Sequence, residues 1–320
     1  MKRVLALFAF FLLGAAPMAQ RPSDPALLIP EAAPELDYVA VANAVTLPAG
    51  TTMGPTAAVA FDAKGHLYVL TRGPQAFFEF DPNGNFVRAF GDKMFTRSHG
   101  LRIDADGNLW ATDVGAHTVM KLNPKGEVLL TLGTRGEAGE WNEAAGSQKL
   151  NQPNDVAIAA NGDVFVVQGH TPGARGDARV LTFSKDGKFI KSWGGKGTGP
   201  GQFDVAHGAA FDAKGLLWVM DRENQRIEVF DADGTFVREM KYKGLPCSVA
   251  IGRDAVYMVN GFAGQLLRLD LSGKVLAATG KPGTGLGEFG EAHFLAISPK
   301  GDLYVADSVN GALVKFVKKG

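Results

Sequence analysis

Short runs of alternating apolar and polar residues fill most of the chain, and turns rich in Asp, Asn, Lys and Gly separate them. Alternation with a period of two is typical of strands that bury one face, whereas helical periodicity is absent after Ala19. Turns such as DAKG and DADG supply residues that tolerate the left-handed backbone of tight hairpins. The pattern therefore predicts an all-β chain built from hairpins.

One such hairpin recurs six times along the chain. Its copies read FDAKGHLYV, IDADGNLWA, IAANGDVFV, FDAKGLLWV, IGRDAVYMV and ISPKGDLYV, and they start at Phe61, Ile103, Ile158, Phe211, Ile251 and Ile297. The starts lie 42, 55, 53, 40 and 46 residues apart, which is the repeat length of a four-stranded propeller blade. The spacing predicts a six-bladed β-propeller.

The sixth copy stops before a fourth strand, since only Lys318, Lys319 and Gly320 follow ALVKFV. A lone strand-like segment, LDYVAVANAVTL at Leu36–Leu47, precedes the first copy. We expect this segment to pair with the last blade, because the pairing closes the propeller ring and removes an exposed sheet edge. The predicted propeller spans residues 36–320 and leaves no second domain.

Composition limits the function classes. Lys and Arg total 33, and Asp and Glu also total 33, so no net charge favours nucleic acid as a partner. Glycine accounts for 41 of 320 residues, as many tight turns require. A single cysteine excludes an internal disulfide and any CxxC metal site.

The segment from Met1 to Ala19 has the character of a signal peptide. Lys2 and Arg3 are basic, and Val4–Ala16 is an unbroken apolar run that is too short to span a bilayer. We expect cleavage near Ala16–Ala19 and a secreted or periplasmic protein that is monomeric and not attached to a membrane. Because disulfides are missing, packing alone must then stabilise it.

Histidine occupies alternate blades at one position of the repeat. The residue four before each repeat start is, in turn, Ala57, His99, Asn154, His207, Cys247 and His293. These residues begin the innermost strands, so three imidazoles should converge on the channel axis. Three imidazoles without a fourth protein ligand are typical of catalytic zinc sites, which keep a position open for water or substrate. The pattern predicts a metal site at these histidines, with zinc preferred over cobalt, iron or manganese.

Two questions about these histidines stay open. They are also explained as core residues whose nitrogens bond to the backbone. An aspartate follows each of them at one constant spacing, as Asp113, Asp221 and Asp307. These carboxylates either orient the imidazoles or cap the loop after the second strand of the blade. Both roles place them at the channel end where first strands begin and second strands end, which we call the mouth.

Longer segments resemble one enzyme family. FTRSHGLRIDADGNLWATDVGAHTVMKL, NQPNDVAI, GPGQFDVAHGAAF and DRENQRIEVF are similar to segments of the peptidyl-α-hydroxyglycine α-amidating lyases. From Met53 onward the chain resembles NHL-repeat propellers more broadly. The resemblance implies that His99, His207 and His293 hold a zinc ion.

The resemblance also assigns residues at the mouth. It implies that Arg72, in LTRG, and Arg222, in DRENQR, bind a substrate carboxylate; otherwise the two arginines only solvate a loop. The catalytic tyrosine of the family lies in a DGY segment where this chain has QGH, so His170 is the candidate general base. Near the third histidine, Phe294 stands where the family has an aspartate and Glu291 where it has a methionine.

A structural calcium ion is the second cofactor of the family. It is bound by that aspartate together with backbone carbonyls that match Val59 and Leu101. Because Phe294 replaces the carboxylate, the resemblance does not predict a complete calcium site here. The two disulfides of the family are also absent, since the chain has one cysteine.

The activity implied by the resemblance is a lyase reaction on a small-molecule or peptide substrate. A carbinolamide, N–CH(OH)–CO₂⁻, would be cleaved to an amide and glyoxylate, with the hydroxyl acidified by the metal. A non-enzymatic NHL scaffold that binds a peptide, protein or glycan at the mouth is the alternative. A calcium-dependent lactonase or esterase ranks last, because only Asn154 supplies the channel asparagines and carboxylates that it needs.

Overall fold

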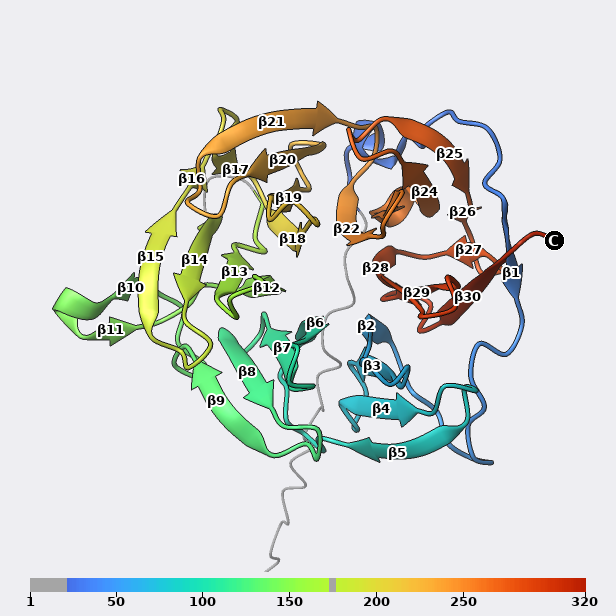
Figure 1. The fold of residues 1–320 in the computed structure, drawn as a ribbon, viewed down its shortest axis with the longest axis horizontal. Helices are drawn as coiled ribbons and strands as arrows, with labels where there is room; N and C mark the ends of the chain where they lie inside the picture. The colour runs from blue at the N-terminus through green and yellow to red at the C-terminus, as the bar shows by residue number, and fades with distance from the viewer. Residues whose placement is uncertain (1–21, 173–176) are drawn as a thin grey trace, which may run out of the picture.

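Six four-stranded antiparallel sheets surround a central channel in the structure, a computed structural model that describes residues 22–172 and 177–320 (Figure 1). Each sheet is one blade, and hairpins carry the chain from the channel to the rim. The fold is therefore the predicted all-β, six-bladed propeller. The predicted signal peptide, residues 1–19, lies outside the described residues. Among those that are described, no helix has the length and hydropathy that a bilayer crossing requires.

Five blades are continuous in sequence, and their strands are given from channel to rim. The first two comprise β2 (Thr56–Phe61), β3 (Leu67–Thr71), β4 (Phe77–Phe80) and β5 (Phe86–Phe90), then β6 (Ser98–Ile103), β7 (Leu109–Asp113), β8 (Thr118–Leu122) and β9 (Val128–Leu132). The third and fourth comprise β12 (Pro153–Ile158), β13 (Val164–Gln168), β14 (Arg179–Phe183) and β15 (Phe189–Trp193), then β18 (Ala206–Phe211), β19 (Leu217–Asp221), β20 (Arg226–Phe230) and β21 (Phe236–Lys241). The fifth comprises β22 (Pro246–Ile251), β23 (Val256–Asn260), β24 (Gln265–Leu269) and β25 (Val275–Thr279).

The sixth blade combines both ends of the described chain. β28 (Ala292–Ile297), β29 (Leu303–Asp307) and β30 (Leu313–Lys318) are its inner strands, and β1 (Tyr38–Val41) pairs antiparallel with β30. The predicted closure is confirmed, although only four residues of Leu36–Leu47 form the strand. In Figure 1, β1 lies at the rim beside the red C-terminal strand.

The rest of this N-terminal arm, residues 34–46, bonds to the two neighbouring blades. On one side, Leu36 N–H donates at 2.9 Å to the carbonyl oxygen of Ala278, in the rim strand β25 of the fifth blade. On the other, Thr46 N–H donates to Gly84 O at 2.8 Å, in the first blade. The arm therefore links three blades and does more than complete one of them.

Shorter elements lie in the loops. They are three two-stranded pairs and three single-turn 3₁₀ helices within the described residues: β10 (Trp141–Asn142) with β11 (Ser147–Gln148), β16 (Gly195–Lys196) with β17 (Gln202–Phe203), β26 (Lys281–Pro282) with β27 (Glu288–Phe289), η1 (Pro25–Leu28), η2 (Glu143–Ala145) and η4 (Gly261–Ala263).

The repeated DxxG turn has one physical basis. Asp104 Oδ1 accepts the N–H groups of Asp106 at 3.0 Å and Asn108 at 2.8 Å, and Gly107 takes the left-handed backbone with φ +82°. The other carboxylate oxygen of Asp104, Oδ2, accepts the indole N–H of Trp110 at 3.1 Å. The aspartate side chain accepts backbone N–H groups of the turn that would otherwise lack a partner, and this stabilises the turn. The same aspartate therefore recurs at the hairpins.

Neighbouring blades pack face to face through apolar side chains. Trp110 of the second blade shares a buried cluster with Val156 and Phe183 of the third. Likewise, Trp218 of the fourth blade packs with Val249 of the fifth. Because this apolar surface lies between the sheets, the starts of the innermost strands are left for polar groups at the channel mouth.

Candidate metal centre and channel mouth

An irregularity of strand pairing recurs in all six blades at the predicted channel position. The register between the two inner strands shifts at Ala57, Asn154, His207, Cys247 and His293, and across His99 and Gly100 in the second blade. Such a bulge leaves a residue out of the ladder and turns its side chain in a new direction. The six positions that the repeat aligns therefore all direct groups into the channel.

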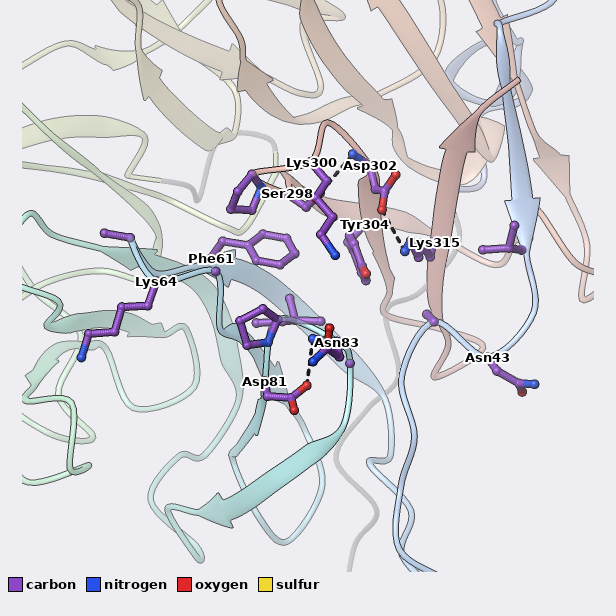
Figure 2. A pocket seen from close by; sticks show the side chains of 18 of the residues that line it. Asn43, Phe61, Lys64, Asp81, Asn83, Ser298, Lys300, Asp302, Tyr304 and Lys315 are labelled. Atoms are coloured by element: carbon purple, nitrogen blue, oxygen red, sulfur yellow. Dashed lines mark hydrogen bonds and ion pairs between the residues drawn. The ribbon is translucent and has the colours of Figure 1, made fainter. Parts of the chain in front are cut away.

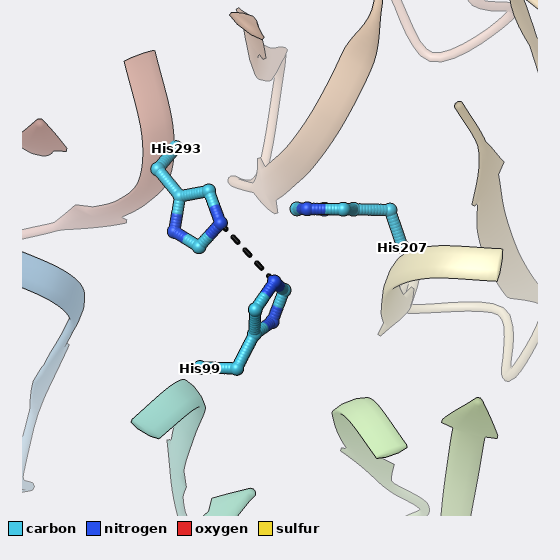
Figure 3. Close-up of side chains that lie close together, drawn as sticks. All are labelled: His99, His207 and His293. Carbon is cyan, nitrogen blue, oxygen red and sulfur yellow. Dashed lines mark hydrogen bonds between the residues drawn. The ribbon is translucent and has the colours of Figure 1, made fainter. Parts of the chain in front are cut away.

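His99, His207 and His293 meet on the channel axis, as Figure 3 shows. Their nearest ligand nitrogens all lie within 4.8 Å of one another, and the three residues are at most 1% exposed. Nε2 of His293 is 3.2 Å from Nε2 of His99. The predicted convergence of imidazoles from alternate blades is thus present in the structure.

Backbone carbonyls of the next blade hold the three imidazoles. Nδ1 of each histidine lies within hydrogen-bond distance of the carbonyl oxygen at the aligned position of the following blade: His99 to Asn154 at 2.7 Å, His207 to Cys247 at 2.9 Å and His293 to Ala57 at 2.7 Å. A carbonyl only accepts, so Nδ1 carries the proton and donates it. Each Nε2 then presents a lone pair to the axis.

The three aspartates that follow the channel histidines do not orient the imidazoles. Asp113 accepts the backbone N–H groups of Thr96 at 2.7 Å and Arg97 at 2.8 Å, and so ties the end of β7 to the start of β6. Asp307 makes the two equivalent bonds in its blade, and Asp221 makes one, from the N–H of Asp204. Asp113 and Asp307 also accept N–H groups of the loop that follows them, such as those of Ala116 and Asn310, each at 2.9 Å. The orienting interpretation is wrong and the capping one is correct, because carbonyls freed by the bulges already occupy Nδ1.

The donor set fits a metal ion. Two lone pairs that face each other across 3.2 Å repel unless a cation lies between them, and Nε2 of His207 is buried without a hydrogen-bond partner. Burial first, and then neighbouring histidines and arginines, hold the pKa of all three well below its ordinary value, so protonation does not resolve the repulsion. A tetrahedral zinc site with Zn–N bonds of about 2.0–2.1 Å has nitrogens roughly 3.4 Å apart.

His170 joins the cluster as a fourth imidazole. Its ring centroid is 4.7 Å from that of His99, and its Nδ1 is 2.8 Å from Oδ1 of Asn154. The amide of Asn154 is fixed in turn, because its Nδ2 donates to Ala206 O at 2.8 Å. Nδ1 of His170 therefore donates and Nε2 keeps its lone pair. Burial, and then the charges of Arg222 and Arg97, hold the pKa of His170 well below its ordinary value.

The two predicted arginines lie at the mouth in different surroundings. Arg222, after β19, forms a bidentate pair with Glu223, from Nη2 to Oε1 at 2.7 Å and from Nε to Oε2 at 3.2 Å, and is 8% exposed, so it does not merely solvate a loop. Its Nη1 is 3.7 Å from Oε1 of Glu291. The side chain of Arg72, after β3, makes one long hydrogen bond to the described residues, from Nε to Ser98 O at 3.3 Å. Burial lowers the pKa of Arg72 to about 10, so it stays charged at neutral pH.

Sequence reasoning missed Arg97 as a residue of this site. Arg97 lies two residues before His99, as Glu291 lies two before His293, and the aspartate caps hold the backbone of both. Glu291 is 1% exposed and accepts the hydroxyl of Ser308. The shared repeat position, two residues before a channel histidine, was the signal that could have found the pair.

Calcium does not fit the residues on the far side of the histidines. Phe294 packs its ring against His293, with centroids 4.9 Å apart. The guanidinium of Arg102 lies 5.6 Å from the centre of the same ring and pairs with buried Asp155. Calcium requires several oxygen ligands, whereas the side chains here are a phenyl ring and the positively charged guanidinium of Arg102.

A separate cavity of about 620 Å³ lies at the seam between the sixth and first blades (Figure 2). It is formed by hairpin turns at the end of the blades opposite the mouth, and Phe61 and Tyr304 pack edge to face in its wall. Lys315 in its lining pairs with Asp302 at 2.8 Å. The cavity contains none of the histidines or arginines of the mouth and is not part of the candidate site.

Known families match two parts of the chain. Residues 173–257 match a family described as a 6-bladed beta-propeller, and residues 289–316 match the NHL repeat. The chain is a six-bladed β-propeller, and its sixth blade matches the NHL repeat. This propeller also has a solved neighbour in fold, a streptogramin B lyase structure, with a TM-score of 0.59 and 14% identity over 84% of this chain and 95% of the other.

The propeller has relatives among amidating enzymes. It is 31% identical over 314 residues to the peptidyl-glycine alpha-amidating monooxygenase of Mus musculus, covering 82% of this chain and 30% of that protein. It is 28% identical over 238 residues to a probable peptidyl-alpha-hydroxyglycine alpha-amidating lyase of Caenorhabditis elegans, covering 69% and 63%. The propeller thus spans about a third of the length of the monooxygenase, and its resemblance to the lyases is confirmed.

Proposed function

We propose that this propeller is a zinc-dependent carbon–nitrogen lyase that cleaves a carbinolamide, N–CH(OH)–CO₂⁻, to an amide and glyoxylate. The observation that carries the proposal is the convergence of three Nε2 lone pairs at a mouth that also holds His170 and positive charge. The resemblance to proteins named as amidating lyases supports the same reaction class.

Each residue of the mouth has a separate role in this reaction. His170 accepts the hydroxyl proton at Nε2, because its Nδ1 is committed to Asn154. As the carbonyl of glyoxylate forms, the C–N bond breaks, and the departing amide nitrogen receives the proton that His170 holds. Arg72 binds the carboxylate and aligns the reacting carbon. A zinc ion at His99, His207 and His293 supplies Lewis-acid chemistry that makes the hydroxyl more acidic.

Arg222 acts through its charge in this scheme. Its guanidinium is satisfied by Glu223 and lies near Glu291, so few of its donors remain for a substrate. Burial lowers its pKa, but Glu223 and the other nearby acids more than offset this and hold the pKa above its ordinary value. A permanent positive charge beside His170 keeps that imidazole neutral and able to accept a proton.

The decisive experiment measures metal content and glyoxylate together. Protein loaded with zinc should hold close to one ion per chain and release glyoxylate from N-benzoyl-α-hydroxyglycine. His207→Ala should lose both, because two imidazoles bind zinc much more weakly than three. His66→Ala is the matched control, since His66 lies in a hairpin turn and contacts Glu79. Zinc-free wild type under metal-replete conditions, or equal glyoxylate release by His207→Ala, would contradict the proposal.

A further inference from the structure

The guanidinium groups at the mouth are unequally satisfied. Arg222 has a carboxylate partner in Glu223, whereas the side chain of Arg72 makes a single long hydrogen bond to the residues that the structure describes. The side chain of Arg97 has no hydrogen bond or ion pair to any residue in 22–172 or 177–320, and its Nε is buried without a partner. A buried donor without an acceptor is costly, so Nε of Arg97 calls for an acceptor that the described residues do not supply. Arg72 is half-buried and has guanidinium donors left for the same ligand.

Arg72 and Arg97 face one small space. A cavity of about 30 Å³ between the loop after β3 and the segment before β6 is lined by both residues. This volume admits one small polar group. Two like charges that share such a space repel each other, and an anion between them relieves the repulsion and supplies the missing acceptors.

The charges around the cavity set the sign of the ligand. Lys93 lines the cavity together with Arg72 and Arg97, and Glu291 is the carboxylate that acts on both guanidiniums. Positive charge is therefore in excess and favours an anion, and the small volume of the cavity limits that anion to one carboxylate.

The backbone around Arg97 is fixed in position. Its N–H donates to Asp113 at 2.8 Å, and its carbonyl accepts the N–H of Val114 at 3.1 Å. His99 follows two residues later on β6, so the two Cα atoms are at most roughly 7 Å apart. After burial and Arg222, the charge of Arg97 is the next cause that lowers the pKa of His170, so its guanidinium lies within electrostatic range of the channel histidines. A carboxylate next to the reacting carbon must lie in the same region.

We propose that Arg97 and Arg72 form a two-arginine clamp for a single carboxylate, and that Arg97 is the residue that makes this propeller selective for substrates with a free carboxylate. This inference rests on the proposed function for the identity of the acid, an α-substituted N-acylglycine. The planar forks of two guanidiniums provide parallel hydrogen bonds to both carboxylate oxygens, which an ammonium group does not reproduce.

The test uses ligands that cannot react. Zinc-loaded protein is titrated by calorimetry with hippurate, an N-acylglycine with a free carboxylate, and with hippuramide, its uncharged amide. Wild type should bind hippurate at least tenfold more tightly. Arg97→Met should weaken hippurate binding by about 10- to 100-fold and leave hippuramide binding unchanged. Arg253→Met, in an exposed turn between β22 and β23, is the matched control and should behave as wild type.

Arg97→Lys keeps the inference testable if the methionine variant does not fold. It retains the charge but not the fork, so it should bind hippurate with intermediate affinity. Unchanged hippurate binding by either variant, or a wild type that does not distinguish acid from amide, overturns the clamp. If the acid is preferred through Arg97 but no glyoxylate is released from the hydroxylated compound, the clamp stands and the lyase reaction is refuted.

Discussion

His170 differs from its three histidine neighbours in what holds it. A side-chain amide, that of Asn154, fixes its Nδ1, whereas backbone carbonyls of the next blade fix the others. Burial and nearby arginines keep it neutral. This arrangement suits a base better than a metal ligand, because its Nε2 lies outside the group of three converging nitrogens.

We therefore expect His170→Ala to lower kcat for glyoxylate release by roughly 10²- to 10⁴-fold while zinc content stays at one ion per chain. Metal analysis and steady-state kinetics on the same sample check this. His117→Ala, at a half-buried histidine that accepts the N–H of Gln152, is the control. Loss of zinc together with activity would show that His170 is a ligand.

A second residue-scale effect concerns Glu228 of the fourth blade. Its carboxylate is 0% exposed, and burial raises its pKa from 4.5 to about 7 despite the nearby guanidinium of Arg226. The folded state thus favours protonated Glu228 over the unfolded state. The stabilisation is complete below pH 4.5 and is lost as the pH rises through 7.

Glu228→Gln cannot ionise, so its unfolding free energy should fall less between pH 5 and pH 8 than that of wild type, by about 1–2 kcal/mol. Urea unfolding at the two pH values measures the difference, with exposed Glu127→Gln as the control. Parallel pH profiles for wild type and Glu228→Gln would rule the effect out.

At the scale of elements, β1 is the strand on which closure of the ring depends. Tyr38 is buried against the sixth blade beside Leu36, while Val39 on the same strand is 47% exposed. Without β1, the backbone of β30 would present an unpaired edge. The arm also supplies bonds to the blades on either side.

Deletion of residues 36–47 should accordingly lower the free energy of unfolding by at least about 3–6 kcal/mol, the burial of one leucine and one tyrosine. Thermal and urea unfolding test this. The single substitutions separate packing from strand pairing: Leu36→Ala should destabilise, and Val39→Ala should stay within about 0.5 kcal/mol of wild type. An unchanged melting temperature after the deletion would contradict the role of the arm.

At the scale of the whole molecule, the features that repeat along the chain could be predicted from the sequence. Six hairpins at blade spacing, the closing strand and the histidines on alternate blades follow from local alternation and from counting positions. The residues missed or misjudged depend on contacts between blades. Every residue has a backbone carbonyl, so residue types do not show which carbonyl accepts the hydrogen bond from Nδ1 of a channel histidine. The aspartates were the only candidate partners that residue types could indicate.

Contacts between blades also determine the part of the channel around Phe294 and Arg102, and the sequence did not predict them. Phe294 was recognised as a departure from the family, but nothing in the spacing showed that Arg102 crosses from the second blade to Asp155 of the third and to Ala209 O of the fourth. A long side chain that spans blades is placed by the packing of several sheets at once. Arg97 was missed for a related reason. Its Nε is buried without a hydrogen-bond acceptor, and this is visible only when the surrounding side chains are in place.

The pairing of β1 with β30 has a consequence for how the molecule is made. Tyr38 and Lys318 are partners although they lie 280 positions apart in the chain. Five blades assemble from consecutive hairpins, but the sixth needs a segment produced among the first and another produced among the last. Contacts of such separation form late and slow the folding of a domain. Until β30 has emerged, the growing chain carries an unpaired β1 that is open to mispairing with other copies, so the synthesis of β30 decides when this propeller is protected from aggregation.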